Sequence, residues 1–216
     1  DDIIYAETVV SYDSGRVYEA SENNYDDKLY GEGGDDILVG NAGDNILDGG
    51  IGSDTITTGS GSDTVILRTR DGGTELTDAD IITDFTDGVD VLGLDNNLLY
   101  TELTRAQGTG SYANDTIISI TDTAENLAIL KGISASDVNY LDFASMSTGN
   151  QNFTGTIGDD VFIGAAGVDT VTTNIGTDIV LTSSGDDAIT IDGTGNKTID
   201  GGAGTDRVIL SQSGVT

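Results

Sequence analysis

The chain repeats itself every nine residues, in two blocks that span residues 31–66 and 155–209. The first block opens GEGGDDILV GNAGDNILD and the second opens GTIGDDVFI GAAGVDTVT, so the same residue types return at fixed places. Ten copies cover 90 of the 216 residues, and a single extra residue, Ile191, interrupts the second block. Self-similarity at a short fixed period predicts a stack of small units, each of which buries its apolar face only against its neighbours.

Two columns of the repeat predict its local structure. The fourth position is Gly in all ten copies, which lets the backbone take a positive φ in a tight turn. The eighth position is Phe or aliphatic in all ten, as expected for the inward side chain of a three-residue strand. Two copies then make one turn of a flattened right-handed coil with two parallel sheets. The turn glycines are Gly34, Gly43, Gly52, Gly61, Gly158, Gly167, Gly176, Gly185, Gly195 and Gly204.

A third column predicts a metal. The sixth position is Asp in eight of the ten copies. In the coil, carboxylates two copies apart lie about one strand spacing, ~4.8 Å, from each other, so they repel unless a cation lies between them. Calcium suits such a site because it takes 6–8 oxygen ligands from carboxylates and carbonyls. The turn offers no sulfur or nitrogen ligand that would favour zinc or copper.

Composition excludes several classes of function. The chain has no His and no Cys, so it cannot hold a Ser-His-Asp triad, a thiol nucleophile, a disulfide or a cysteine zinc site. The formal net charge of −30 disfavours nucleic acid and anionic membranes as partners. No apolar run approaches the ~20 residues of a membrane span. No pair of carboxylates stands out as catalytic, and we expect the chain not to be an enzyme.

The repeats resemble the GGxGxDxUx nonapeptides of the RTX (repeats-in-toxin) family of calcium-binding proteins. The resemblance implies a parallel β-roll that binds several Ca²⁺ ions, export by a type I secretion system, and folding outside the cell when calcium is met. It also implies a ligand role for the Asp at position 6. The residues that carry this role over are Asp36, Asp54, Asp63, Asp160, Asp169, Asp178, Asp187 and Asp206.

In such a roll each ion joins copies i and i+2. The pairs expected from this spacing are Asp36–Asp54, Asp160–Asp178, Asp169–Asp187 and Asp187–Asp206. A degenerate copy at 22–30 places Asp27 in phase. Asp27 and Asn45 are expected to contribute weaker ligands, with Asn45 coordinating through its amide oxygen. Lys197 replaces the ligand with a cation, so we expect no calcium between Asp178 and the turn at 192–200.

The complete predicted fold is all-β, with two parallel β-rolls joined by a mainly antiparallel capping segment. The predicted domains are an N-terminal β cap at 1–30, a first roll at 31–66, a capping segment at 67–153, and a second roll at 154–216 that is truncated at its C-terminal end. Within the capping segment, the stretch DIITDFTDGVDVLGL at 80–94 resembles the sequence that often closes an RTX roll. Its aspartates, Asp80, Asp84, Asp87 and Asp90, are either solvated or bind a further ion.

One face of the second roll is unusually apolar. Its outward positions are Val161, Ile163, Ile179 and Leu181. An outward apolar patch commonly marks a contact, so we expect this face to be covered by the central segment or by another copy of the protein. The opposite face presents threonines at 170, 172 and 190.

Three functions are compatible with the sequence. The first is a non-enzymatic, calcium-stabilised module of a large extracellular or cell-surface protein of the adhesin, surface-layer or filament type. The second is an accessory roll of a secreted protease, lipase or alginate-modifying enzyme whose catalytic domain lies outside this chain. The third uses the threonine face to bind ice or glycan. The expected partners are calcium, neighbouring domains of a parent protein, and other copies of the chain.

Overall fold

The computed structural model describes residues 3–5, 17–19 and 26–211, and these are built from short strands and four 3-10 turns with no α-helix. By its internal contacts the chain divides into two compact units, one formed by residues 1–93 and 102–143 and the other by residues 94–101 and 144–216. The expected all-β fold with parallel rolls is confirmed. Most of the predicted N-terminal cap, residues 22–25 of the degenerate copy and the last five residues lie outside the described residues.

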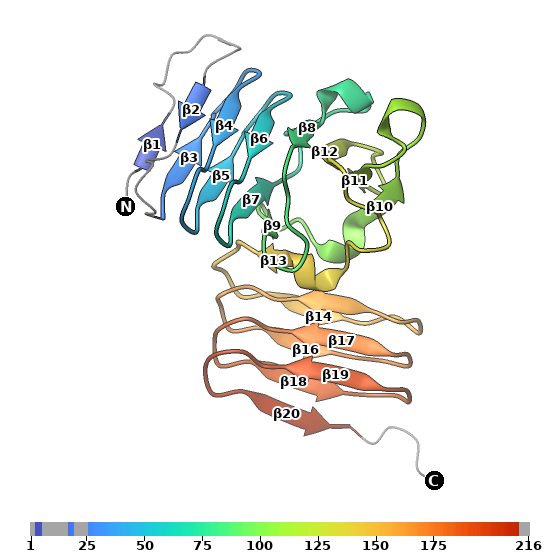
Figure 1. Ribbon diagram of the computed structural model, residues 1–216. Coiled ribbons are helices and arrows are strands. Elements are labelled where there is room, and N and C mark those ends of the chain that lie inside the picture. Colours follow the sequence, from blue (N-terminus) through green and yellow to red (C-terminus); the bar gives the residue numbers. More distant parts are fainter. Residues whose placement is uncertain (1–2, 6–16, 20–25, 212–216) are drawn as a thin grey trace. The chain divides into compact units, whose positions relative to one another are not determined.

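The first unit contains a parallel β-roll of two facing sheets (Figure 1). Consecutive strands belong to opposite sheets, because each nonapeptide supplies one strand and the chain then turns to the other side of the roll. One sheet holds β1 (Ile3–Tyr5), β3 (Lys28–Tyr30), β5 (Ile46–Asp48), β7 (Thr64–Leu67) and β9 (Val91–Leu94). The other holds β2 (Val17–Glu19), β4 (Ile37–Val39), β6 (Thr55–Thr57) and β8 (Asp80–Ile82).

An antiparallel segment continues the second of these sheets. It consists of β10 (Leu103–Gln107), β11 (Thr116–Ile120) and β12 (Asn126–Leu130), of which β12 pairs in parallel with β8. The 3-10 turns are η1 (Leu76–Asp78), η2 (Tyr100–Glu102), η3 (Gly110–Tyr112) and η4 (Tyr140–Asp142). The short strand β13 (Phe143–Ser145) follows at the boundary between the units. The predicted antiparallel cap is therefore present, but β8 and β9 add a further turn to the parallel roll itself.

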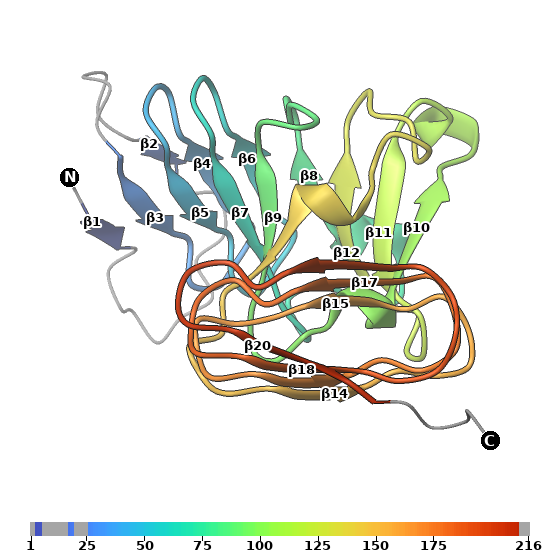
Figure 2. The ribbon, with the colours of Figure 1, turned by 90° about the horizontal axis from the view of Figure 1, so that it is seen from below.

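The second unit contains the second roll, which Figure 2 shows as a flattened coil with one sheet on each side. Its four-stranded sheet holds β14 (Asn152–Thr154), β16 (Thr170–Thr172), β18 (Ala188–Ile191) and β20 (Arg207–Leu210). Its three-stranded sheet holds β15 (Val161–Ile163), β17 (Asp178–Leu181) and β19 (Lys197–Asp200). The extra residue Ile191 lengthens β18 by one position and pairs with Leu210, so the interruption leaves the register intact.

The eighth position of each repeat forms the core of both rolls. In the first roll Leu29, Leu38, Leu47, Ile56 and Val65 are completely buried. In the second roll the core is Phe162, Val171, Val180 and Ile189, with Phe153 and Ile199 packed against it. Val208 remains 51% exposed because it lies on β20, the last strand of the described residues.

The second roll begins one repeat earlier than the sequence pattern indicated. Residues 146–154 read MSTGNQNFT, a degenerate copy with Gly149 and Phe153 in phase. Phe153 stacks on Phe162 with the ring centroids 5.1 Å apart, and β14 pairs in parallel with β16. This copy has lost the Asp of the repeat but has kept its inward side chain.

Candidate metal-binding turns

The aspartates at position 6 form ladders along the sides of the rolls. In each ladder Oδ1 of one Asp accepts the backbone N–H of the position-6 residue two copies earlier. The donor–acceptor distances are 2.7 Å for Asp36–Asp54, 3.1 Å for Asp160–Asp178, 2.7 Å for Asp169–Asp187 and 3.1 Å for Asp187–Asp206. All four pairs that the spacing predicted are thus brought together. The first three are 18 residues apart, and the last is 19 residues apart because of Ile191.

The second carboxylate oxygen, Oδ2, of several of these aspartates indicates a bound cation. Asp54, Asp63 and Asp187 are buried, and within the described residues the Oδ2 atom of each has no hydrogen-bond partner. A buried carboxylate oxygen without a donor is costly, and protein interiors rarely leave one unsatisfied. An ion with several oxygen ligands would remove that cost at each turn.

Burial also changes the acidity of the ladder. It raises the pKa of Asp54 to about 7, opposed by the hydrogen bond from the Asp36 N–H and reinforced by the charge of Asp36. Burial likewise raises the pKa of Asp63 to about 6. Burial also raises the pKa of Asp169. These carboxylates hold their protons more tightly in the fold than in water, which is the expected behaviour of a ligand set without its cation.

The glycine at position 1 leaves room around the carboxylate of its own copy. A Cβ on Gly49 would lie 2.3 Å from Asp54 Oδ2, and one on Gly164 would lie 2.4 Å from Asp169 Oδ2. The carboxylate therefore folds back over a backbone without a side chain. This places the carboxylate oxygen beside the turn, whose carbonyls are the other hard ligands that calcium takes.

Two residues at position 6 present nitrogen instead of a second carboxylate oxygen. Asn45 accepts the Asp27 N–H through Oδ1 at 3.0 Å, whereas its Nδ2 donates to the carbonyls of Gly40 and Gly43 and to Asp63. Oδ1 of Asn45, the atom predicted to coordinate a metal, thus accepts a backbone N–H as Oδ1 of the ladder aspartates does, and its role as a ligand stays a prediction. Lys197 directs its ammonium to Asp178.

The ladders extend beyond the residues that the repeat pattern selected. The Asp54 N–H donates to Asp80 Oδ1 at 2.9 Å, and the Asp63 N–H donates to Asp90 Oδ1 at 3.1 Å. Burial raises the pKa of Asp80 well above its usual range, with the charge of Asp54 adding to the shift. The insertions before Asp80 and Asp90 broke the nine-residue phase, so the sequence suggested these residues only as members of a loose acidic group.

A third missed position is Gln151, whose N–H donates to Asp169 Oδ1 at 2.7 Å. Its Oε1 is buried and has no hydrogen-bond partner among the described residues. The signal that could have identified it is Gly149, which lies nine residues before Gly158. The repeat pattern does not identify this copy because Gln151 stands in place of the Asp.

The other two aspartates of the closing stretch have separate roles. Asp84 accepts the N–H groups of Thr58 and Gly59 at 2.8 and 3.0 Å and so caps the turn that follows β6. Asp87 lies beside Asp142, whose Oδ1 accepts the Gly88 N–H at 3.2 Å. Across the described residues no group of three or more acidic side chains converges on one point. Each site would therefore take one or two carboxylates and complete its shell with carbonyl or amide oxygens and water.

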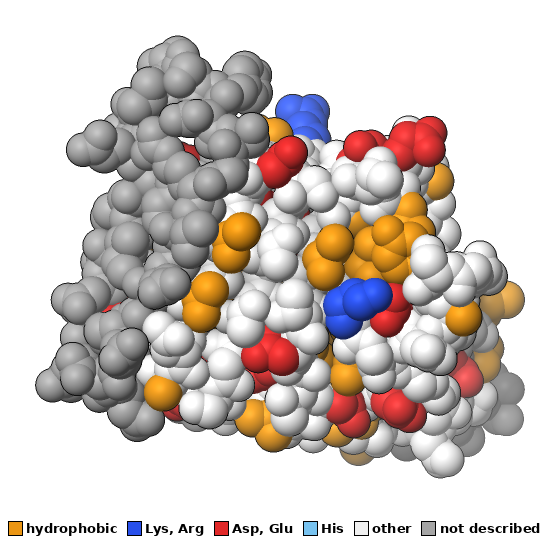
Figure 3. All heavy atoms as spheres, turned by 45° about the horizontal axis from the view of Figure 1, so that its top comes forward, with side chains coloured by type: hydrophobic (Ala, Val, Ile, Leu, Met, Phe, Trp, Pro, Cys, Tyr) orange, Lys and Arg blue, Asp and Glu red, His pale blue; other side chains and the backbone are white. Residues whose placement is uncertain are grey.

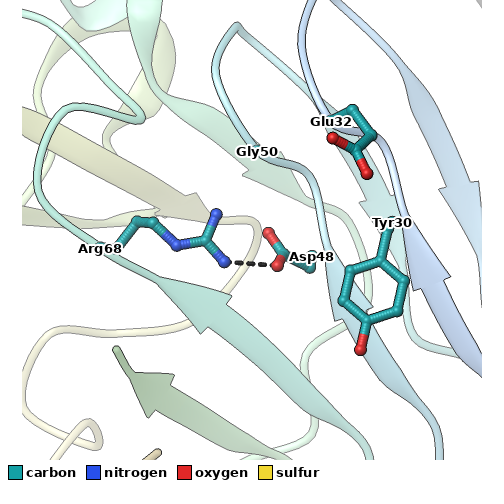
Figure 4. A pocket seen from close by; sticks show the side chains of 5 residues that line it. All are labelled: Tyr30, Glu32, Asp48, Gly50 and Arg68. Atoms are coloured by element: carbon teal, nitrogen blue, oxygen red, sulfur yellow. Dashed lines mark hydrogen bonds and ion pairs between the residues drawn. The ribbon is translucent and has the colours of Figure 1, made fainter. Parts of the chain in front are cut away.

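A small pocket of about 110 Å³ lies on the first roll. It is lined by Tyr30, Glu32, Asp48, Gly50 and Arg68 (Figure 4). The Arg68 guanidinium pairs with Asp48 and also lies 3.4 Å from Asp71. Burial raises the pKa of Asp71 to about 7, opposed by the charge of Arg68. The positive charge of Arg68 thus balances carboxylates in and beside the pocket.

The cover predicted for the apolar face of the second roll stays a prediction. Ile163 is 9% exposed, and Val161, Ile179 and Leu181 are intermediate in exposure.

On the face of the molecule drawn in Figure 3, acidic side chains are scattered and basic ones are few. The described residues also contain no helix long and apolar enough to cross a membrane.

The family model for the RTX calcium-binding nonapeptide repeat matches the chain four times, over residues 23–46, 30–65, 147–189 and 191–212. These matches together span half of the chain and include both rolls. The chain belongs to the RTX calcium-binding nonapeptide-repeat family. The match at 147–189 includes the degenerate copy that starts the second roll. The RTX chain is thus a calcium-binding repeat module, and its buried carboxylate ladders fit that ion.

Two solved structures similar to this RTX chain are repeat subunits of a mannuronan C5-epimerase from Azotobacter vinelandii. The AlgE6R3 subunit is 24% identical, with a TM-score of 0.47, over 63% of this chain and 81% of the subunit. The AlgE6R2 subunit is 24% identical, with a TM-score of 0.41, over 60% of this chain and 86% of the subunit. No curated protein sequence matches the chain.

The raised pKa values predict how the metal-free RTX chain responds to pH. Because Asp54 and Asp63 have folded-state values of about 7 and 6, above the 3.8 of an ordinary Asp, the fold binds protons more tightly than the unfolded chain. The free energy of unfolding should therefore fall as pH rises from about 4 to 7. In chelator we expect more β-structure at pH 5 than at pH 7.5, measured by circular dichroism. With saturating calcium the difference should shrink or reverse, because protons compete with the ion. Less β-structure at pH 5 than at pH 7.5 in chelator would contradict the assignment.

Proposed function

We propose that this chain is a non-enzymatic structural module of a large secreted or cell-surface protein of the adhesin, surface-layer or filament class. In this proposal the module folds when it meets calcium outside the cell, after export by a type I secretion system. The observation that carries the proposal is the row of buried carboxylate oxygens without donors, represented by Asp54, Asp63 and Asp187. No enzyme chemistry is needed to explain them, whereas a scaffold that requires calcium accounts for each one.

The proposed ions lie along the ladders, between turns two copies apart. The candidate pairs are Asp36–Asp54, Asp54–Asp80, Asp63–Asp90, Asp160–Asp178, Gln151–Asp169, Asp169–Asp187 and Asp187–Asp206. When bound, calcium supplies the positive charge that the stacked carboxylates lack. In Asp54, Asp63 and Asp187 a backbone N–H holds Oδ1, and Oδ2 is left without a donor among the described residues. In the copies of Asp54 and Asp169, a glycine at position 1 keeps the space beside the carboxylate open.

Calcium would act on folding as well as on stability. The metal-free chain carries a net charge of −30, and self-repulsion of that size opposes a compact state. Because the turns exist only in the fold, the free energy of calcium binding adds directly to the free energy of folding. Extracellular calcium modules commonly bind in the ~10⁻⁴–10⁻³ M range. An affinity of that order would leave the chain unfolded at cytoplasmic calcium levels and folded outside.

Limited proteolysis across a calcium titration tests this proposal. The chain should be cleaved throughout at micromolar calcium and become resistant with a midpoint of roughly 10⁻⁴–10⁻³ M. Magnesium at the same concentrations is the matched control, since its preference for octahedral geometry and bound water should leave it ineffective. A chain already resistant in chelator would contradict calcium-dependent folding outside the cell.

A further inference from the structure

Lys197 occupies the position that Asp holds in eight of the ten copies, and its side chain is buried. Its side chain is 6% exposed and that of Asp178 is 2% exposed. Nζ lies 2.9 Å from Asp178 Oδ2, the oxygen that faces the turn, and donates to the carbonyl of Gly176 at 2.7 Å. A longer contact of 3.4 Å reaches the carbonyl of Thr194. The ammonium group thus forms an ion pair with Asp178 and donates hydrogen bonds to two carbonyls.

These oxygens belong to two turns of the roll that lie one coil apart. Asp178 and Gly176 are positions 6 and 4 of the earlier copy, and Thr194 is position 3 of the copy that contains Lys197. The backbone pairing confirms the alignment, because Asp178 lies opposite Lys197 in the β17–β19 ladder. A carboxylate and turn carbonyls from two adjacent coils are the ligand types that we propose for calcium elsewhere in the roll. Here an ammonium group contacts them.

Asn45 likewise replaces the Asp of position 6 with a hydrogen-bond donor, but its side chain is neutral. Its Nδ2 donates to the carbonyls of Gly40 and Gly43 at 3.0 Å each and to Asp63 Oδ1 at 3.0 Å. Both residues that depart from Asp at position 6 of the ten nonapeptides therefore bring N–H donors to turn carbonyls and to a ladder carboxylate. The departures fill their turns with hydrogen-bond donors.

We propose that Lys197 is a resident cation that takes the place of one calcium ion, so that the turn it closes forms without metal. The inference rests on the proposed function, because it assumes that the neighbouring turns bind calcium. The proposal predicts that the two sides of the second roll depend on calcium to different degrees. The turns of the Asp169–Asp187–Asp206 ladder require the ion, whereas on the opposite side of the coil the turn between Asp178 and Lys197 does not.

Two substitutions and a matched control test the proposal. Lys197→Asp restores the ligand of the repeat, and Lys197→Met removes the charge while keeping an unbranched side chain. Lys28→Met removes the same charge from an exposed position in the first roll. The bound calcium is counted by isothermal titration calorimetry, and the melting temperature is measured by circular dichroism in saturating calcium.

We expect Lys197→Asp to bind one more calcium ion than the wild type, a gain that a merely structural role for the lysine would not produce. Lys197→Met should lower the melting temperature in saturating calcium by about 10 °C, because it leaves the buried Asp178 without its counter-charge. Lys28→Met should match the wild type. An unchanged ion count in a folded Lys197→Asp variant, or an unchanged melting temperature in Lys197→Met, would overturn the proposal.

Failure of the proposed function gives a different result. If the wild type binds no calcium at all, the proposed function is wrong whatever the variants do. The melting temperature of Lys197→Met still reports whether the ammonium supports the turn. If Lys197→Asp does not fold, the comparison of Lys197→Met with Lys28→Met decides the question alone.

Discussion

Replacing Asp187 by alanine should remove two calcium ions at once. Asp187 belongs to two adjacent pairs of its ladder: its Oδ1 accepts the Asp169 N–H, and its own N–H donates to Asp206. Its Oδ2 is buried and lacks a hydrogen-bond partner among the described residues. An ion present at 100 times its dissociation constant stabilises a fold by about 2.7 kcal/mol. The loss of two such ions should lower the free energy of unfolding by about 5 kcal/mol at that calcium concentration.

The neighbouring Asp186 provides the matched control for this experiment. It is exposed, and its Oδ1 accepts the Thr205 N–H at 2.8 Å. Asp186→Ala removes the same charge but no ladder ligand, so it should cost about 1 kcal/mol and leave the ion count unchanged. Calorimetric titration gives the count, and urea unfolding in calcium gives the stability. Equal ion counts for wild type and Asp187→Ala would show that Asp187 is not a ligand.

Replacing Gly185 by alanine should disrupt the second roll, whereas the same change at Gly158 should be tolerated. Both glycines are position 4 of their copies. Gly185 has a φ of +144°, and a Cβ there would lie 2.1 Å from the carbonyl oxygen of Gly167, one coil earlier. A backbone carbonyl cannot move away without breaking the ladder. We expect a cost of about 3–5 kcal/mol from the strained φ and the steric overlap together.

Gly158 tests whether the stacked carbonyl, rather than the repeat position itself, requires glycine. A Cβ on Gly158 would meet Thr156 Oγ1 at an ordinary 3.6 Å, and its φ lies outside the left-handed region. Gly158→Ala should therefore change the free energy of unfolding by less than about 1 kcal/mol. Urea unfolding of both variants in saturating calcium makes the comparison. Similar losses at the two positions would contradict this explanation of the glycine column.

The parts of the fold that follow from the nine-residue phase could be predicted from the sequence. The phase places Leu38 and Ile56 inward and brings Asp36 beside Asp54, because residues two copies apart lie side by side on neighbouring strands of one sheet. The phase fails where an insertion changes the length of a turn. Asp80 and Asp90 continue the ladders only because longer loops return the chain to the same register, and no local pattern shows that return.

Two other features depend on side-chain geometry that a repeat pattern does not contain. The sequence shows that Lys197 lacks a ligand oxygen, but not that its ammonium reaches Asp178 and the Gly176 carbonyl. It shows that Asn45 has an amide, but not that the oxygen bonds the backbone and the nitrogen faces the turn. In both cases the position of the terminal atoms decides the function of the turn.

The central claim is that calcium neutralises the buried carboxylate ladders and thereby holds the rolls together. Thermal unfolding followed by far-ultraviolet circular dichroism at pH 7.5, in calcium, in magnesium and in chelator, tests it most directly. We predict a cooperative β-sheet transition in calcium alone, with little β-structure in chelator and no recovery with magnesium. The same β-sheet signal and melting temperature in calcium and in chelator would contradict the claim.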